Sequence, residues 1–92
     1  MDARGHGRAW PGSTLHGSSS TFIWTAGTGV SQVWLDVGTT TGGNQIYAAS
    51  EGTGTSQTVT GIPTNGSTLY VRLWSLVGGA WSYTDYTYTT GP

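Results

Sequence analysis

The fold is decided by residues 67–90, STLYVRLWSLVGGAWSYTDYTYTT. Two runs of alternating apolar and polar residues flank Gly78-Gly79, a pair of glycines that is typical of a two-residue hairpin turn. Because side chains in a strand repeat with a period of two, alternate residues of each run lie on opposite faces. The segment therefore predicts two long antiparallel strands, over 67–76 and 81–90.

The two faces of this hairpin differ in chemistry. A turn at the glycine pair sets Arg72 opposite Asp85 and Trp74 opposite Tyr83, with Trp81 on the same face. The other face is apolar and consists of Leu69, Val71, Leu73, Tyr86 and Tyr88. Burying Arg72 would cost several kcal/mol unless it were well paired. We therefore expect the apolar set to face the core and Arg72 to face outward.

The rest of the chain reads as short strands separated by glycine-rich turns. A first, edge strand is expected around Leu15 and His16. Further strands are predicted at Ser20–Thr25, Val30–Val37, Gln45–Ala49 and Gln57–Ile62. Helix formers are scarce and β-branched threonine is abundant. The sequence thus predicts an all-β, seven-stranded antiparallel β-sandwich over residues 13–90, with residues 1–12 as a flexible tail or linker and 91–92 as a short tail.

Composition supports a folded domain and excludes several functions. The chain holds 5 Trp and 5 Tyr but only 8% charged residues, whereas disordered chains are poor in aromatics and rich in charge. A net charge of −1 offers no general attraction for nucleic acid, and Arg4, His6 and Arg8 form no groove in their glycine-rich segment. No apolar run approaches the roughly 20 residues needed to span a bilayer, so no membrane insertion is expected.

Metal, cofactor and catalytic chemistry are not expected either. There is no cysteine, which excludes thiolate zinc sites and disulfides, and His6 and His16 are the two histidines. Asp36 and Asp85 could be imagined as the carboxylate pair of a glycosidase, but a flat sheet face offers no cleft. Glu51 lies in a glycine-rich turn and is expected to be solvated. We therefore expect no metal, no cofactor and no enzyme activity.

Several short motifs resemble those of fibronectin type III and immunoglobulin-like modules in bacterial secreted or surface proteins. These are Trp24 on the second strand, the alternating Val33-x-Leu35-x-Val37, and Thr60-Gly61-Ile62-Pro63 ahead of Tyr70. The resemblance implies an extracellular or cell-surface location and a non-catalytic module. Such a module acts as a scaffold or protein-contact domain beside neighbouring domains of a parent protein.

The resemblance also implies that the third, sixth and seventh strands share one sheet. One outer face would then carry the candidate ligand-binding residues Trp34, Asp36, Arg72, Trp74, Trp81, Tyr83 and Asp85. Exposed aromatic patches usually mark interaction surfaces. A flat aromatic platform with charged neighbours suits the apolar faces and hydroxyls of sugars, so polysaccharide binding is the alternative function. Exposed edge strands also allow a homodimer by strand pairing or swapping.

Overall fold

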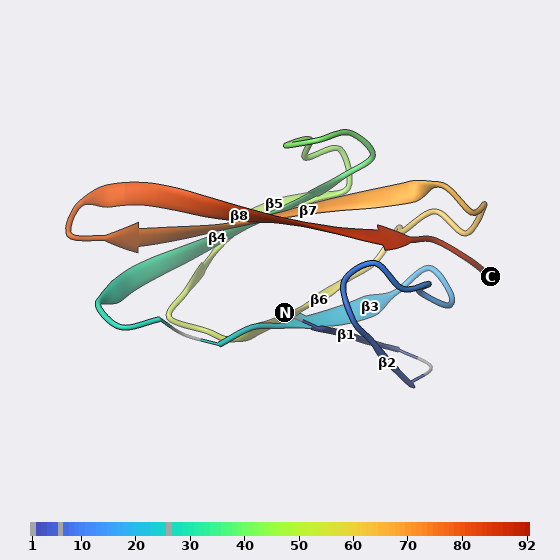
Figure 1. The fold of residues 1–92 in the computed structure, drawn as a ribbon, viewed down its shortest axis with the longest axis horizontal. Helices are drawn as coiled ribbons and strands as arrows, with labels where there is room; N and C mark the ends of the chain where they lie inside the picture. Colours follow the sequence, from blue (N-terminus) through green and yellow to red (C-terminus); the bar gives the residue numbers. More distant parts are fainter. Residues whose placement is uncertain (1, 6, 26) are drawn as a thin grey trace.

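The computed structural model describes residues 2–5, 7–25 and 27–92, with side chains from Trp10 onward. Within this part of the chain there are eight strands and no helix (Figure 1). The strands are β1 (Asp2–Gly5), β2 (Gly7–Ala9), β3 (Ser20–Ile23), β4 (Val30–Gly38), β5 (Tyr47–Gly52), β6 (Ser56–Val59), β7 (Thr68–Val77) and β8 (Ala80–Thr89).

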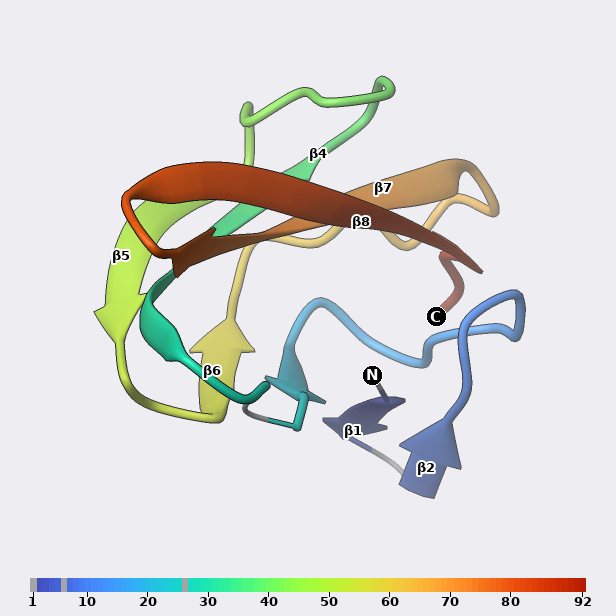
Figure 2. The ribbon, with the colours of Figure 1, turned by 60° about the vertical axis from the view of Figure 1, so that its left-hand side comes forward.

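The strands form two antiparallel sheets that face each other, as in a β-sandwich. One sheet has the order β2-β1-β3-β6 and the other the order β5-β4-β7-β8. Figure 2 shows the β4–β5 loop rising from the second sheet on the side away from β3 and β6. The prediction that the strands over 30–37, 67–76 and 81–90 share one sheet is confirmed, because β4, β7 and β8 are neighbours in it.

The β7–β8 hairpin has the register that the sequence predicts. Arg72 pairs with Asp85 and Trp74 with Tyr83, and Val77 pairs with Ala80 beside the turn. Gly78 and Gly79 both have positive φ, at 58° and 80°. Only glycine adopts such values readily, which is why this pair can close the two-residue turn.

The core lies between the two sheets and is made mostly of alternate residues from the strands, with Leu15, Trp24 and Ile62 added from the connecting segments. Its buried members are Leu15, Phe22, Trp24, Val33, Leu35, Val37, Val59, Ile62, Leu69, Val71 and Tyr88. Leu73 and Tyr86 are partly buried and pack against this cluster, so the predicted apolar face of the hairpin is confirmed as the inner face. Phe22 meets Tyr88 edge-on, with ring centroids 5.6 Å apart, and so joins the two sheets through their largest buried side chains.

The predicted count of seven strands is wrong at the N-terminal side. Six of the predicted strands form, as β3 to β8, but the one around Leu15 is reduced to a single parallel bridge between Thr14 and Thr89. Leu15 is buried nonetheless, and its N–H donates to the Thr89 carbonyl at 2.7 Å. The buried Leu15 side chain and a few backbone hydrogen bonds hold this segment in place. It forms no continuous strand ladder.

Two further strands form where the sequence shows no periodicity. β1 pairs with β2 through Ala3↔Ala9 and with β3 through Ala3↔Phe22. Backbone hydrogen bonds define these pairings. Such bonds do not require alternating apolar and polar residues, which is the pattern by which a strand is predicted from sequence. The flexibility of residues 1–12 stays a prediction.

Candidate functional site: an aromatic face with a hollow

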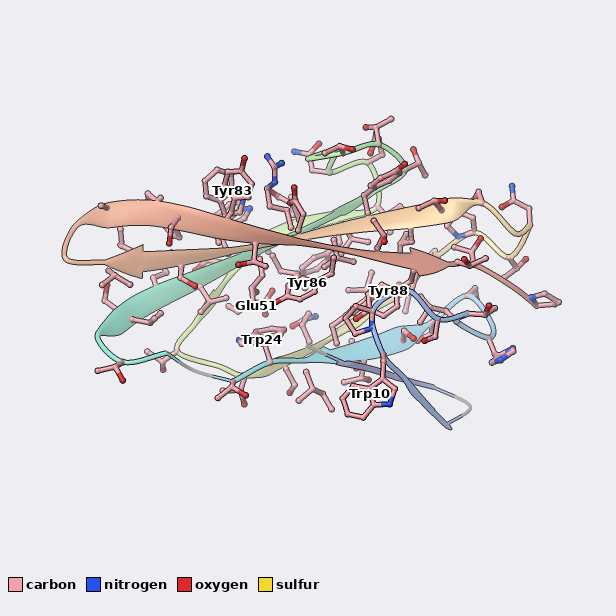
Figure 3. All side chains as sticks on the ribbon, in the orientation of Figure 1. Trp10, Trp24, Glu51, Tyr83, Tyr86 and Tyr88 are labelled. Carbon is pink, nitrogen blue, oxygen red and sulfur yellow. The ribbon has the colours of Figure 1, made fainter. Side chains whose placement is uncertain are left out.

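The outer face of the β5-β4-β7-β8 sheet brings all seven predicted site residues together. We call it the aromatic face and define it by Trp34, Asp36, Arg72, Trp74, Trp81, Tyr83 and Asp85. The strand register places them in neighbouring rows: Trp34, Trp74 and Tyr83 lie side by side on β4, β7 and β8. Asp36, Arg72 and Asp85 form the next row. In Figure 3, Tyr83 lies on the far side of this sheet from the core residues Trp24, Tyr86 and Tyr88.

Arg72 and Asp85 form the ionic part of the aromatic face. Two guanidinium nitrogens of Arg72, Nε and Nη2, donate to the two carboxylate oxygens of Asp85 at 2.7 and 2.9 Å. The hydrogen bonds to Arg72 hold the pKa of the Asp85 carboxyl below its ordinary value, and the same bonds raise the pKa of Arg72. The guanidinium carbon also lies 3.8 Å from the ring centroid of Tyr83, a cation–π contact.

Asp36 is held between two indoles. Trp34 Nε1 donates to Asp36 Oδ1 at 2.8 Å, and Trp74 Nε1 donates to Asp36 Oδ2 at 3.0 Å. Trp34 and Asp36 are two residues apart on β4, and Trp74 on the neighbouring strand β7 pairs directly with Trp34. The strand period and the register therefore aim both indole N–H groups at one carboxylate.

Three of the rings line an open hollow on the aromatic face. An open hollow of about 410 Å³ is lined by Trp34, Asp36, Trp74 and Trp81. Trp74 stands nearly perpendicular to Trp81, at an interplanar angle of 86°, and is tilted by 56° from Tyr83. Edge-to-face contacts between neighbouring rings thus set the indoles at steep angles to one another on this face.

The aromatic face is open to solvent. Trp34 is 36% exposed, Trp81 44% and Tyr83 51%, while Trp74 is half-buried between its neighbours. Trp10, the aromatic nearest the N-terminus, lies by the other sheet in Figure 3. Arg72 and Trp74 are half-buried by ring contacts on the outer face and take no part in the core.

The β4–β5 loop approaches the aromatic face from one side, which the sequence analysis missed. Gly42 has a φ of +71°, and a Cβ added there would lie 2.8 Å from Arg72 Nη1. Gln45 braces the loop: its Oε1 accepts the N–H of Thr39, and its Nε2 donates to Thr40 Oγ1. The run Gly38-Thr-Thr-Thr-Gly-Gly signals only a turn, so its closeness to Arg72 depends on where the loop folds in space.

Glu51 is not the solvated turn residue that the sequence predicts. It lies on β5, half-buried, and its Oε2 accepts the hydroxyl proton of Tyr47 at 2.7 Å. Figure 3 places Glu51 between the sheets, near Trp24. Burial, together with the Glu51 hydrogen bond and charge, raises the pKa of Tyr47 to about 12. The strand predicted at Gln45–Ala49 thus begins later, at Tyr47, and runs further, to Gly52.

The described part of the chain carries no metal-ligand cluster and no membrane-spanning helix. Among residues 2–5, 7–25 and 27–92, no three His, Cys, Asp or Glu residues group together as metal ligands. The same residues include no helix that is both long and apolar enough to cross a membrane. His6, one of the two histidines considered as ligands, lies outside the described residues, as do the side chains of Arg4 and Arg8.

The chain was compared with known proteins by sequence and by structure. No protein-family model, no curated protein and no solved structure matches it. Any function therefore has to be argued from the aromatic face itself.

Proposed function

We propose that this chain is a non-catalytic β-sandwich module of a secreted or cell-surface protein, and that it binds carbohydrate on the aromatic face. The observation that carries the proposal is the open hollow lined by Trp34, Trp74, Trp81 and Asp36. Solvent-exposed aromatic clusters are uncommon on a surface unless something packs on them. A type III fibronectin-like or immunoglobulin-like ancestry belongs to the same proposal.

Sugars offer the two kinds of group that this hollow can hold. The C–H face of a pyranose ring is apolar and can lie against an indole, which contributes a large contact area. The hydroxyls need polar partners at the rim. An ionised carboxylate has about four acceptor positions, and the indoles of Trp34 and Trp74 take two of those on Asp36. The remaining positions are available to sugar hydroxyls.

The carboxylates of the aromatic face are engaged in ways that favour binding over catalysis. Glycoside hydrolysis commonly needs two carboxyl groups about 5–10 Å apart on either side of the scissile bond. Asp85 is bound at both oxygens by Arg72, and Asp36 by two indoles. Asp36 is also the one carboxylate among the residues lining the hollow. We therefore propose binding without turnover.

A protein-contact or scaffold role is the second candidate. It is favoured by the exposure of the β7–β8 hairpin: Val77 beside its turn is 43% exposed, and β8 is an edge strand. A neighbouring domain of a parent protein could pack on such a hairpin, or a second copy could pair with β8. The backbone of β8 is partly covered at its end, where Gly12 donates to the Thr87 carbonyl.

The two candidates are separated by a binding test with matched tryptophan variants. The parent chain, Trp81→Ala and Trp10→Ala are passed through gels containing xylan, soluble cellulose, chitosan or starch. Loss of a central interface tryptophan commonly costs about 2 kcal/mol or more, so Trp81→Ala should abolish most retardation by the polysaccharide that is bound. Trp10→Ala makes the same chemical change at an exposed residue away from the aromatic face and should leave retardation unchanged.

The opposite results are equally clear. If no polysaccharide retards the parent chain, the carbohydrate proposal fails and a protein-contact role is favoured. If both variants lose retardation equally, the binding surface lies elsewhere. A dimer would appear as a concentration-dependent mass in sedimentation.

A further inference from the structure

We propose that the hollow on the aromatic face takes a cationic group, and that its ligand is a glycan with free, protonated amines, an amino sugar polymer that lacks N-acetylation. This inference rests on the proposed function and names the class of glycan. Three observations carry it: the charge inside the hollow, the donors and acceptors that its lining still offers, and the extent of the exposed rings around it.

The charge in the hollow is negative. Among the described residues that line it, Asp36 is the ionisable one, and the other three are tryptophans. The nearest cation in the strand register, Arg72, lies with its guanidinium carbon 5.7 Å from the ring centroid of Trp74 and is bound at two nitrogens by Asp85. The row of Asp36, Arg72 and Asp85 therefore carries one more negative than positive charge, and a ligand cation would balance it.

The donors of the lining are already used. Trp34 and Trp74 both donate their indole N–H to Asp36. The hollow thus offers carboxylate lone pairs and ring faces, which accept hydrogen bonds and attract cations. A ligand suits it when it brings N–H donors and positive charge. The carbonyl of an acetamido group or the carboxylate of a uronic acid would find few donors there.

The surroundings of the hollow favour a chain of sugars over a small ammonium ion. Both Trp81, which lines the hollow, and Tyr83, which follows it on β8, are exposed, at 44% and 51%. A single ammonium group bound against Asp36 would leave the rings of Trp81 and Tyr83 without a ligand contact. A sugar chain can place its amine against Asp36 and the C–H faces of neighbouring units on Trp81 and Tyr83.

The ionisable and charged groups that face Asp36 come from β7 and β8. Arg72 and Tyr70 lie on the same face of β7, and Asp85 and Tyr83 lie on the same face of β8. On β5 the residues paired with Trp34 and Asp36 are Ser50 and Ala48, which do not titrate. Above neutral pH the ligand amine is expected to lose its charge, whereas the hydrogen bond to Asp85 raises the pKa of Arg72.

The test compares three oligosaccharides of equal length by titration calorimetry: one built of glucosamine, one of N-acetylglucosamine and one of glucose. The glucosamine oligomer should bind about tenfold more tightly than the other two. The preference should vanish in the parent chain when the pH is raised until the amine is neutral, and it should weaken as salt is added. This comparison uses the parent chain alone, so its result does not depend on whether a variant folds.

Asp36→Asn should remove the same preference at low pH. Its amide oxygen can accept one of the two indole N–H groups, whereas its NH2 group cannot accept the other. Glu51→Gln is the matched control: it removes one carboxylate charge between the sheets rather than in the hollow, and it should leave the preference intact. The indole environment of each variant is checked by its near-ultraviolet circular dichroism.

Each contrary outcome is informative. Equal affinity for the three oligosaccharides overturns the cationic inference and leaves the carbohydrate proposal standing. If none of them binds, and the polysaccharide gels show no retardation either, the proposed function itself fails. Binding of tetramethylammonium as tight as that of the glucosamine oligomer would overturn the assignment to a sugar chain.

Discussion

Arg72 and Asp85 face each other across β7 and β8 and share two hydrogen bonds, from Nε at 2.7 Å and from Nη2 at 2.9 Å. The side chains are 19% and 39% exposed. Exposed ion pairs add little to stability because water and salt screen them. The two-point geometry matters more, since it fixes the plane of the guanidinium 3.8 Å from the Tyr83 ring centroid.

Replacing Asp85 by Asn should produce a small stability loss that depends on pH. Arg72 lowers the pKa of the folded Asp85 carboxyl below 3.8. A depressed pKa means that the folded state holds the charged form more tightly, so the stabilisation is present above about pH 3.8. It is lost as the pH falls below that value. Urea unfolding at neutral pH and at about pH 3 measures the difference between the parent chain and the variant.

The expected difference is positive at neutral pH and close to zero in acid. A difference that grows as the pH falls would contradict the assignment of the pair. Thr87→Ser, a mild change further along β8, serves as a control that should show no such pH dependence.

Tyr47 should lose its proton well above pH 10.0, the ordinary pKa of a tyrosine. Burial is the largest cause of its raised pKa of about 12, and the Glu51 hydrogen bond and charge add to it. Because the folded state keeps the proton beyond pH 10.0, this group's contribution to stability is complete below pH 10.0 and is lost as the pH rises toward 12. The absorbance of tyrosinate during an alkaline titration, compared with that of Tyr47→Phe, isolates this phenol.

Glu51→Gln should lower the pKa of Tyr47 only part of the way to its ordinary value, because burial remains. A Tyr47 that titrates normally in the parent chain would show that the hydroxyl is not held against Glu51. A pKa that returns fully to 10.0 in Glu51→Gln would show instead that the carboxylate, not burial, is the main cause.

The sequence was sufficient for the hairpin because Gly78-Gly79 and period-two alternation together determine a register. Once Val77 faces Ala80, every later pair follows by counting, and the placement of Arg72 outward follows from the cost of burying it. The same logic separated Trp34 and Asp36 from Val33 and Leu35 on β4.

The shape of the candidate site could not be predicted in this way. Strand alternation says which face Trp74 and Trp81 share, but their angle of 86° depends on rotamers and on contacts between rings. The indole bonds to Asp36 likewise depend on the rotamers of Trp34 and Trp74. The strands β1 and β2 were missed for a different reason, because their pairing uses backbone groups that every residue type has.

Gly42 offers a test of how the β4–β5 loop supports the aromatic face. Gly42 and Gly61 both have positive φ, at +71° and +74°, so alanine at either position should cost about 1–2 kcal/mol of backbone strain. A Cβ at Gly61 would meet nothing within 4 Å, whereas one at Gly42 would lie 2.8 Å from Arg72 Nη1.

The end of an arginine side chain can move away from a new methyl group. Gly42→Ala and Gly61→Ala should therefore unfold at nearly the same urea concentration. They should differ in the pKa of Asp85. In Gly42→Ala the displaced guanidinium can no longer hold the carboxylate as well, and the pKa of Asp85 should rise toward 3.8. In Gly61→Ala it should stay depressed. The carboxyl carbon shift of Asp85, followed by nuclear magnetic resonance through an acid titration, distinguishes them. Identical titrations in the two variants would mean that the loop does not rest against Arg72.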